Sequence, residues 1–205
     1  MLKGVIFSLR DVLAKRGPID AALLGETFKL LKFLKRRGVV PVFASNHEWI
    51  ARNDKTGENR NFQEIIENEV GDVSFYRAGK NGMPFKPKAA AVEHILAAQG
   101  RGKREVLFVG NSDTDMRAAR NGGVLFLNAV WHGEANPYGY QFESPMDIAR
   151  FVDCICLGLN NWFWAIERDT LRAYALAPFT TLSPSYAVAH AYSADAKGDS
   201  QRWCW

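Results

Sequence analysis

Residues 4–13 read GVIFSLRDVL, an apolar run that ends in a polar turn. The run lacks the polar alternation of a half-exposed strand, which predicts a short strand over residues 2–8 that is buried on both faces. The same pattern returns in residues 40–47, VPVFASNH, and in residues 106–124, VLFVGNSDTDMRAARNGGV. A polar residue follows each of the three apolar runs: Ser8, Ser45 and Asn111.

Helical patterns separate these apolar runs. Apolar residues recur at helical spacing over residues 24–34, and Gly38, which follows two arginines, predicts the end of that helix. The remaining elements are predicted as helices over residues 61–70, 89–98 and 114–121, and as strands over residues 39–44, 73–76, 105–109 and 124–128. Strands that alternate with helices predict parallel βαβ units, and therefore an α/β fold with a central parallel sheet between two helical layers. Ligands of such a sheet bind beyond the carboxyl ends of its strands, so the three polar residues are expected to meet there.

Four segments, in this order, resemble the motifs of the haloacid dehalogenase (HAD) superfamily of phosphotransferases: residues 4–13, 40–47, 86–92 (KPKAAAV) and 106–124. In that family the first motif reads Asp-x-Asp-Gly-x-Leu, and the second ends in Ser/Thr-Asn. The third supplies a lysine, and the fourth reads Gly-Asp-x-x-x-Asp. The resemblance implies a Rossmannoid, HAD-like three-layer domain without a large cap, over residues 1–158.

Three acidic positions of these motifs are changed in this chain. Ser8 and Arg10 stand where the first motif has its two aspartates, and Asn111 replaces the first acid of the fourth motif. In a working member the first aspartate attacks phosphorus, and the second transfers the proton. Mg²⁺ neutralises the negative charge between the attacking carboxylate and the phosphate. Ser8 cannot hold Mg²⁺ as a carboxylate does, and Arg10 cannot shuttle protons because its guanidinium stays protonated. The resemblance therefore implies a retained fold with lost or altered chemistry.

The other motif positions imply a phosphate site and a degenerate metal site. Ser45, Asn46 and Lys86 match the residues that bind phosphate in the family, and Lys88 is the alternative lysine. Asn111 and Asp115 match the metal position, although Asn111 brings no charge. We expect no cofactor, and Mg²⁺ only if the site still functions.

Two further residues bear on the chemistry. Asp11 is the candidate replacement nucleophile, but three positions after Ser8 correspond to several ångströms at ~3.3 Å per residue, whereas catalysis tolerates about 1 Å. Asp113 also lies close to the expected site. Arg10 either takes the place of the metal by pairing with Asp115 or points into solvent.

Composition restricts the class of protein. The 205 residues carry a formal net charge of +4, and the densest basic stretch, residues 29–37, is either a solvated helix face or a nucleic-acid-binding surface. Three cysteines without metal-ligand spacing, and no apolar run of ~18 residues, predict a reduced, cytoplasmic protein without a membrane partner. Residues 159–205 are expected to form a helical or irregular, aromatic extension that either closes the domain edge or faces a partner.

The favoured function is that of a catalytically impaired pseudo-phosphatase. Such a protein would be a structural, sensing or regulatory subunit of a complex, with protein partners and with a phosphorylated ligand or nucleic acid as further partners. One alternative is an active HAD-type phosphohydrolase that acts on a macromolecular or phosphorylated substrate with an atypical nucleophile. The other is a nucleic-acid-binding module.

Overall fold

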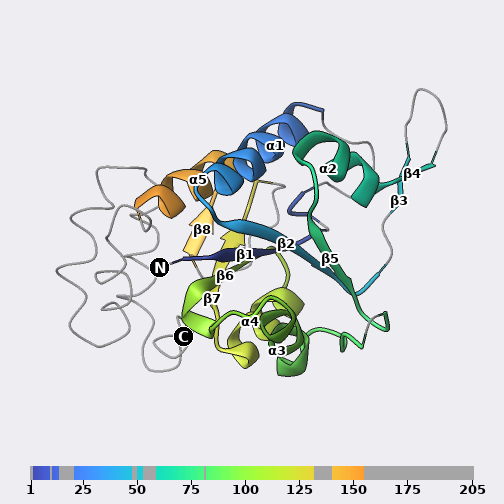
Figure 1. Ribbon diagram of the computed structural model, residues 1–205. Coiled ribbons are helices and arrows are strands. Elements are labelled where there is room, and N and C mark those ends of the chain that lie inside the picture. The colour runs from blue at the N-terminus through green and yellow to red at the C-terminus, as the bar shows by residue number, and fades with distance from the viewer. Residues whose placement is uncertain are drawn as a thin grey trace.

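A single parallel sheet forms the centre of the molecule (Figure 1). The computed structural model describes residues 2–9, 11–13, 21–47, 50–52, 59–80, 82–131 and 140–154. The six strands lie in the order β5-β2-β1-β6-β7-β8, and every neighbouring pair is parallel. Their bounds are β1 Gly4–Ser8, β2 Val40–Ser45, β5 Ser74–Arg77, β6 Val106–Gly110, β7 Leu125–Ala129 and β8 Tyr140–Phe142.

Helices cover both faces of the sheet, which confirms the predicted three-layer α/β fold (Figure 1). One face carries α1 (Ala21–Arg36), α2 (Phe62–Val70) and α5 (Pro145–Cys154), and the other carries α3 (Ala89–Ala98) and α4 (Asp113–Gly122). A 3₁₀ turn, Lys103–Glu105, precedes β6.

Alternate residues of each strand pack into the hydrophobic cores on the two faces of the sheet. Phe7 and Phe43 pack under α1 with ring centroids 5.9 Å apart, whereas Ile6 and Val42 face α3 and α4. Because strands with both faces covered need apolar side chains at every position, the continuous apolar runs of the sequence predicted these strands well.

The basic stretch of α1 ties this helix to its neighbours. Lys35 Nζ donates to the carbonyl oxygen of Val70, at the end of α2, over 2.7 Å. Lys32 Nζ lies 3.1 Å from Glu69 Oε2, and Arg37 forms an ion pair with Asp153 of α5. These cations therefore join α1 to α2 and α5, which does not favour the nucleic-acid alternative.

Two features were absent from the sequence-based expectation. A short antiparallel pair, β3 (Ile50–Arg52) with β4 (Asn59–Asn61), lies between β2 and α2. The second feature is the edge strand β8, which lies beside β7 and is followed by α5. In the described part of the chain, the elements between β2 and β5 are the β3–β4 pair and α2, and a domain without a large cap stays a prediction.

The predicted C-terminal extension lies outside the described residues, as does the boundary at residue 158. Among the described helices, none combines the length and the apolar character needed to cross a membrane.

Candidate functional site

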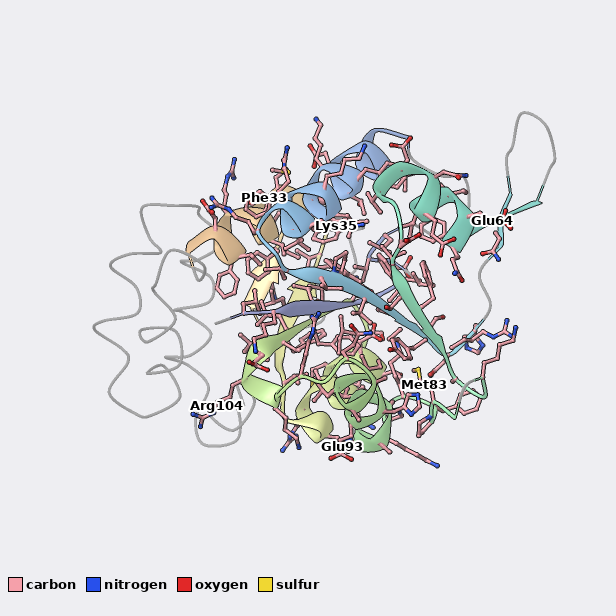
Figure 2. The ribbon with its side chains drawn as sticks, in the orientation of Figure 1. Phe33, Lys35, Glu64, Met83, Glu93 and Arg104 are labelled. Atoms are coloured by element: carbon pink, nitrogen blue, oxygen red, sulfur yellow. The ribbon has the colours of Figure 1, made fainter. Side chains whose placement is uncertain are left out.

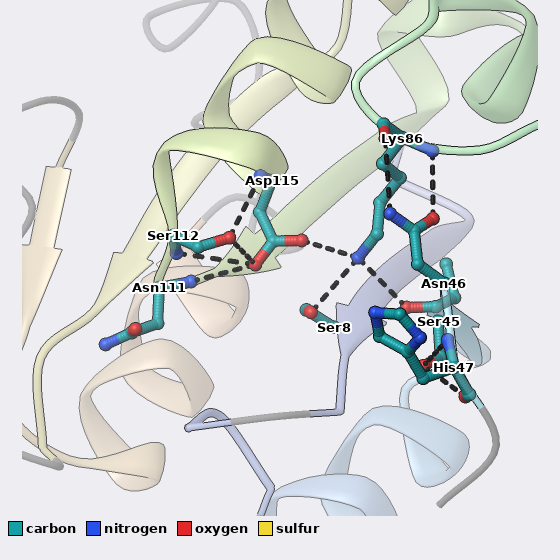
Figure 3. Close-up of polar contacts among 9 residues, drawn as sticks. Ser8, Ser45, Asn46, His47, Lys86, Asn111, Ser112 and Asp115 are labelled. Atoms are coloured by element: carbon teal, nitrogen blue, oxygen red, sulfur yellow. Dashed lines mark hydrogen bonds and ion pairs between the residues drawn. The ribbon is translucent and has the colours of Figure 1, made fainter.

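The predicted site residues meet at the carboxyl ends of the central strands (Figure 3). Ser8 is the last residue of β1, Ser45 is the last residue of β2, and Asn111 directly follows β6. Lys86 reaches this place from the loop before α3, and Asp115 reaches it from the first turn of α4. The predicted convergence of Ser8, Ser45 and Asn111 at one edge of the sheet is thus found in the structure, and Lys86 and Asp115 join them there.

Lys86 is the centre of the site. Its Nζ donates to Ser8 Oγ and to the carbonyl oxygen of Ala44, each over 3.2 Å, and to Asp115 Oδ1 over 2.5 Å. The residue is 7% exposed. An ammonium group has three protons and no lone pair, so these three acceptors use its full hydrogen-bonding capacity.

The two neighbouring residues predicted to bind phosphate are also bonded within the protein. Asn46 Nδ2 donates to the carbonyl oxygen of Lys86 over 3.2 Å, and Lys86 N donates to Asn46 Oδ1 over 2.9 Å. Ser45 Oγ donates to the His47 carbonyl over 2.7 Å and accepts from His47 N over 3.1 Å. The structure brings Ser45, Asn46 and Lys86 together, and phosphate binding by them stays a prediction.

Asp115 has a structural role at the start of α4. Its Oδ2 accepts from Ser112 Oγ over 2.8 Å and from the backbone N–H groups of Ser112 and Asn111 over 3.4 Å each. Ser112 Oγ in turn accepts from Asp115 N over 3.2 Å, which completes a capping box. The pattern Ser-x-x-Asp at residues 112–115 signals this arrangement in the sequence.

The electrostatics of Asp115 favour its ionised form. Burial of the carboxyl group raises its pKa, but the charge and hydrogen bond of Lys86, with the bonds at the start of α4, lower it by more. The pKa of Asp115 therefore lies below its ordinary value of 3.8. The described site contains one carboxylate and one ammonium group, which neutralise each other.

Gly110 makes room for this carboxylate. A Cβ at residue 110 would lie 2.5 Å from Asp115 Cβ and 2.9 Å from Phe126 Cε2, closer than carbon atoms approach without a shift. The glycine of the fourth motif is thus explained by the close approach of α4 to the end of β6.

Asn111 contacts the end of β7 at the edge of the site. It is 8% exposed, and its Nδ2 donates to the carbonyl oxygen of Ala129, the last residue of β7, over 3.0 Å. Its predicted role as a metal ligand remains a prediction.

The residues that the structure describes at the site do not fit a divalent cation. Mg²⁺ prefers carboxylate oxygens in an octahedral arrangement. Within the described ranges, no group of three or more His, Cys, Asp or Glu side chains could hold a metal ion. Asp115 Oδ1 is paired with Lys86, whose positive charge would repel a cation.

Asp11 occupies the position of the glycine in the family's first motif. Its φ is 55°, in the left-handed region that glycine adopts freely and that aspartate tolerates. Leu13 N donates to the Leu9 carbonyl over 3.0 Å, and Trp131 Nε1 donates to the Val12 carbonyl over 2.8 Å, so the turn is held on both sides. The left-handed backbone gives a structural reason for a residue such as aspartate here, and the catalytic role of Asp11 stays a prediction.

Asp113 and Arg10 are the two remaining residues of the sequence-based interpretation. Asp113 is at the surface, where its Oδ2 lies 2.9 Å from Arg117 Nε. Arg10 lies outside the described residues, so its predicted pairing with Asp115 stays a prediction. In the described part of the chain, the cation that pairs with Asp115 is Lys86, which the sequence-based interpretation had assigned to phosphate.

Solved structures with the same fold include two phosphatases. A protein from Corynebacterium glutamicum is 22% identical, with a TM-score of 0.52, over 77% of this chain and 96% of that chain. The D,D-heptose 1,7-bisphosphate phosphatase from B. bronchiseptica, complexed with magnesium and phosphate, is 15% identical with a TM-score of 0.51, over 74% and 98% of the two chains. The deoxy-D-mannose-octulosonate 8-phosphate phosphatase from Haemophilus influenzae, in a cobalt-bound form, is 12% identical with a TM-score of 0.50, over 82% and 94%.

At these identities the likeness concerns the fold alone, and no curated protein sequence matches the chain. A family model described as haloacid dehalogenase-like hydrolase matches residues 9–123, which is more than half of the 205 residues. The match includes the loop that carries Lys86 and the start of α4 with Asp115, and it begins one residue after Ser8. The chain therefore belongs to the haloacid dehalogenase-like hydrolases.

Proposed function

We propose that this chain is a HAD-like pseudo-phosphatase that has lost phosphoryl transfer and is a structural, sensing or regulatory subunit of a protein complex. The observation that carries the proposal is the bonding of Lys86. Its ammonium group is shared among Ser8, Ala44 and Asp115, so the described site is neutral and internally satisfied.

Covalent catalysis at Ser8 lacks a base. A serine hydroxyl becomes a nucleophile when an adjacent group removes its proton. The group next to Ser8 Oγ is the Lys86 ammonium, which donates to the hydroxyl and also bonds to a carboxylate. Ser8 is therefore held as a hydrogen-bond acceptor.

A phosphate dianion would also disrupt the site. To bond to Lys86 it would have to displace one of the three acceptors of Nζ, and it would bring a second negative charge beside the buried carboxylate of Asp115. Family members avoid this repulsion with a divalent cation, for which the described residues provide no ligand set.

Phosphate release tests the proposal. Purified protein is assayed on p-nitrophenyl phosphate, on a phosphoserine peptide and on a sugar phosphate, with and without Mg²⁺. We expect no release above a mock-purified control and no difference between the wild type and Lys86→Met.

Mg²⁺-dependent release that Lys86→Met abolishes would refute the proposal. If that release were lost in Asp11→Asn and kept in Ser8→Ala, the chain would be a hydrolase with an atypical nucleophile.

A further inference from the structure

We propose that the described residues 77–80 and 82–88 of the loop between β5 and α3 bind an acidic segment of a protein partner. Phe85 is the apolar anchor of this partner loop, and Lys80 and Lys88 form its cationic rim. The inference rests on the proposed function, in which the chain works by holding a partner, and it names the chemistry of that partner.

Phe85 is an exposed aromatic residue next to the buried site. It is 53% exposed, although the residue that follows it, Lys86, is buried. Within the described ranges, the other large apolar side chain classed as exposed is Val40, at 37%. Aromatic residues are enriched among the few side chains that dominate binding energy at protein interfaces. Phe85 is thus the strongest apolar anchor on the described surface.

The first half of the partner loop is fixed by backbone bonds. Gly79 N donates to the Met83 carbonyl over 3.0 Å, and Met83 N donates to the Lys80 carbonyl over 3.1 Å. Gly79 and Gly82 both have φ of 75°, which permits this tight turn. Met83 is 2% exposed and packs into the core of the α3 and α4 layer (Figure 2).

The second half is fixed by side chains from other elements. Asn46 bonds to both backbone groups of Lys86, and Asn121 Nδ2 of α4 donates to the Pro87 carbonyl over 2.8 Å. Lys88 N donates to the Phe85 carbonyl over 3.2 Å. A loop that is ordered before binding loses little conformational entropy when a partner docks. The free-energy cost of binding a partner at Phe85 is therefore low.

The charge of this region has one sign. Residues 74–92 contain four cations and no aspartate or glutamate: Arg77, Lys80, Lys86 and Lys88. Lys86 is neutralised inside the protein by Asp115, whereas Lys80 and Lys88 are exposed. In the part of the chain that the structure describes, neither of these two side chains forms a hydrogen bond or an ion pair.

Six cations elsewhere on the described surface are paired with carboxylates: Lys3, Lys32, Arg37, Lys103, Arg117 and Arg150. The exposed Phe85 thus shares its loop with two exposed lysines that pair with no carboxylate in the described part of the chain. Charge complementarity selects an acidic partner for such a surface and speeds its association.

A protein segment fits this surface better than nucleic acid. Nucleic-acid binding depends on several phosphate contacts along a track of cations. The partner loop carries two exposed lysines and one exposed aromatic side chain, and the basic stretch of α1 has three cations engaged with α2 and α5. An apolar centre with a charged rim is the usual anatomy of a protein interface.

Binding of a designed probe tests the inference. The probe is a fluorescein-labelled twelve-residue peptide of Glu and Asp around a central Leu-x-x-Leu, measured by anisotropy with the full chain. We expect binding at micromolar concentration that weakens as salt rises. Phe85→Ser should weaken it at least about tenfold, and Lys80→Glu/Lys88→Glu should do the same and remove most of the salt dependence.

Matched controls separate the partner loop from general effects. Val40→Ser removes the other exposed apolar side chain, and Lys29→Glu/Arg36→Glu changes the net charge by the same amount on α1. Both controls should bind the peptide within about twofold of wild type, and all variants should keep the wild-type melting temperature.

Three results would overturn the inference: no peptide binding at millimolar concentration, wild-type binding by Phe85→Ser, or an equal loss in the α1 control. Preferential binding of a single-stranded oligonucleotide, lost in Lys80→Glu/Lys88→Glu, would assign the loop to nucleic acid instead. Because phosphate release is measured separately, enzyme activity together with Phe85-dependent peptide binding would refute the proposed function and leave this surface in place.

Discussion

The ammonium group of Lys86 and the carboxylate of Asp115 form a buried ion pair, with Nζ 2.5 Å from Oδ1 and with 5% and 4% of the two side chains exposed. The pair joins the loop before α3 to the first turn of α4 and extends through Ser8 to the end of β1. Buried pairs are weak stabilisers relative to an apolar core, but loss of one partner leaves an uncompensated charge.

Removal of the carboxylate charge is therefore expected to destabilise the fold. Asp115→Asn leaves the buried Lys86 without its counter-ion, and we expect a loss of about 3–5 kcal/mol in the free energy of unfolding. Urea denaturation measures it. Arg117→Ala is the control, because it breaks the exposed pair with Asp113 and should cost less than about 1 kcal/mol.

The double variant Lys86→Met/Asp115→Asn should cost clearly less than the sum of its single variants, because it leaves neither charge alone. Additive losses, or an Asp115→Asn loss no greater than that of Arg117→Ala, would contradict a coupled buried pair.

The acid sensitivity of the fold is expected to depend on Asp115. Its pKa is lower in the folded protein than its ordinary value of 3.8, so the stabilisation is complete above that pH. It is lost as the pH falls through the lower, folded-state pKa, because the unfolded chain binds the proton first. Urea denaturation between pH 2 and 6 should therefore show a shallower acid decline in Asp115→Asn than in wild type. Parallel declines would mean that other carboxylates control acid unfolding.

Asp11 is expected to matter through its backbone conformation. Asp11→Gly and Asp11→Val both remove the carboxylate, but a β-branched residue is strained at a φ of 55°. We expect Asp11→Val to be less stable than Asp11→Gly by about 1–2 kcal/mol, measured by thermal or urea unfolding. Equal stabilities would show that the turn does not need the left-handed conformation.

Two glycine-to-alanine substitutions should have opposite effects. At Gly110 the added Cβ would overlap Asp115 and Phe126, and such overpacking costs about 1–3 kcal/mol. At Gly25, inside α1, nothing lies within 4 Å of the added Cβ, and alanine should stabilise the helix by about 0.5–1 kcal/mol. Melting temperatures that move in the same direction would argue against the close approach at Gly110.

The sequence predicted the sheet because both faces of its central strands are covered. Continuous apolar runs, such as residues 4–8, identify such strands, and the order of the motifs predicted where they converge. The three-residue β3, β4 and β8 are too short for a periodic signal. Helix α5 was missed although Ser144, Pro145 and Asp147 form a readable start: Ser144 Oγ caps the Asp147 N–H over 3.2 Å.

The chemistry of the site was harder to predict than its location. Lys86 and Asp115 were each identified by motif position, with phosphate as the expected partner of Lys86 and with pairing to Arg10 as one of two alternatives at Asp115. Position in a motif does not show which charges neutralise each other, since that depends on three-dimensional distances. The Ser-x-x-Asp pattern at residues 112–115 is a signal that could have indicated the capping role of Asp115, but nothing in the sequence placed Lys86 Nζ on its second oxygen.

Restoration of acids gives a positive control for metal binding. Ser8→Asp with Arg10→Asp returns two carboxylates to the first motif, so this variant should gain Mg²⁺ affinity over wild type. Calorimetric titration with Mg²⁺ checks it. Catalysis need not return, because Asn111 remains neutral.

The central claim is that Lys86, and not a metal ion, neutralises Asp115. Thermal melting of the wild-type protein in rising Mg²⁺, against NaCl of matched ionic strength, tests this claim most directly. We expect the two series to give the same melting temperatures, and a chelator to leave them unchanged. A melting temperature that climbs with millimolar Mg²⁺, but not with matched NaCl, would show that the metal site survives and that Lys86 is not the counter-ion of Asp115.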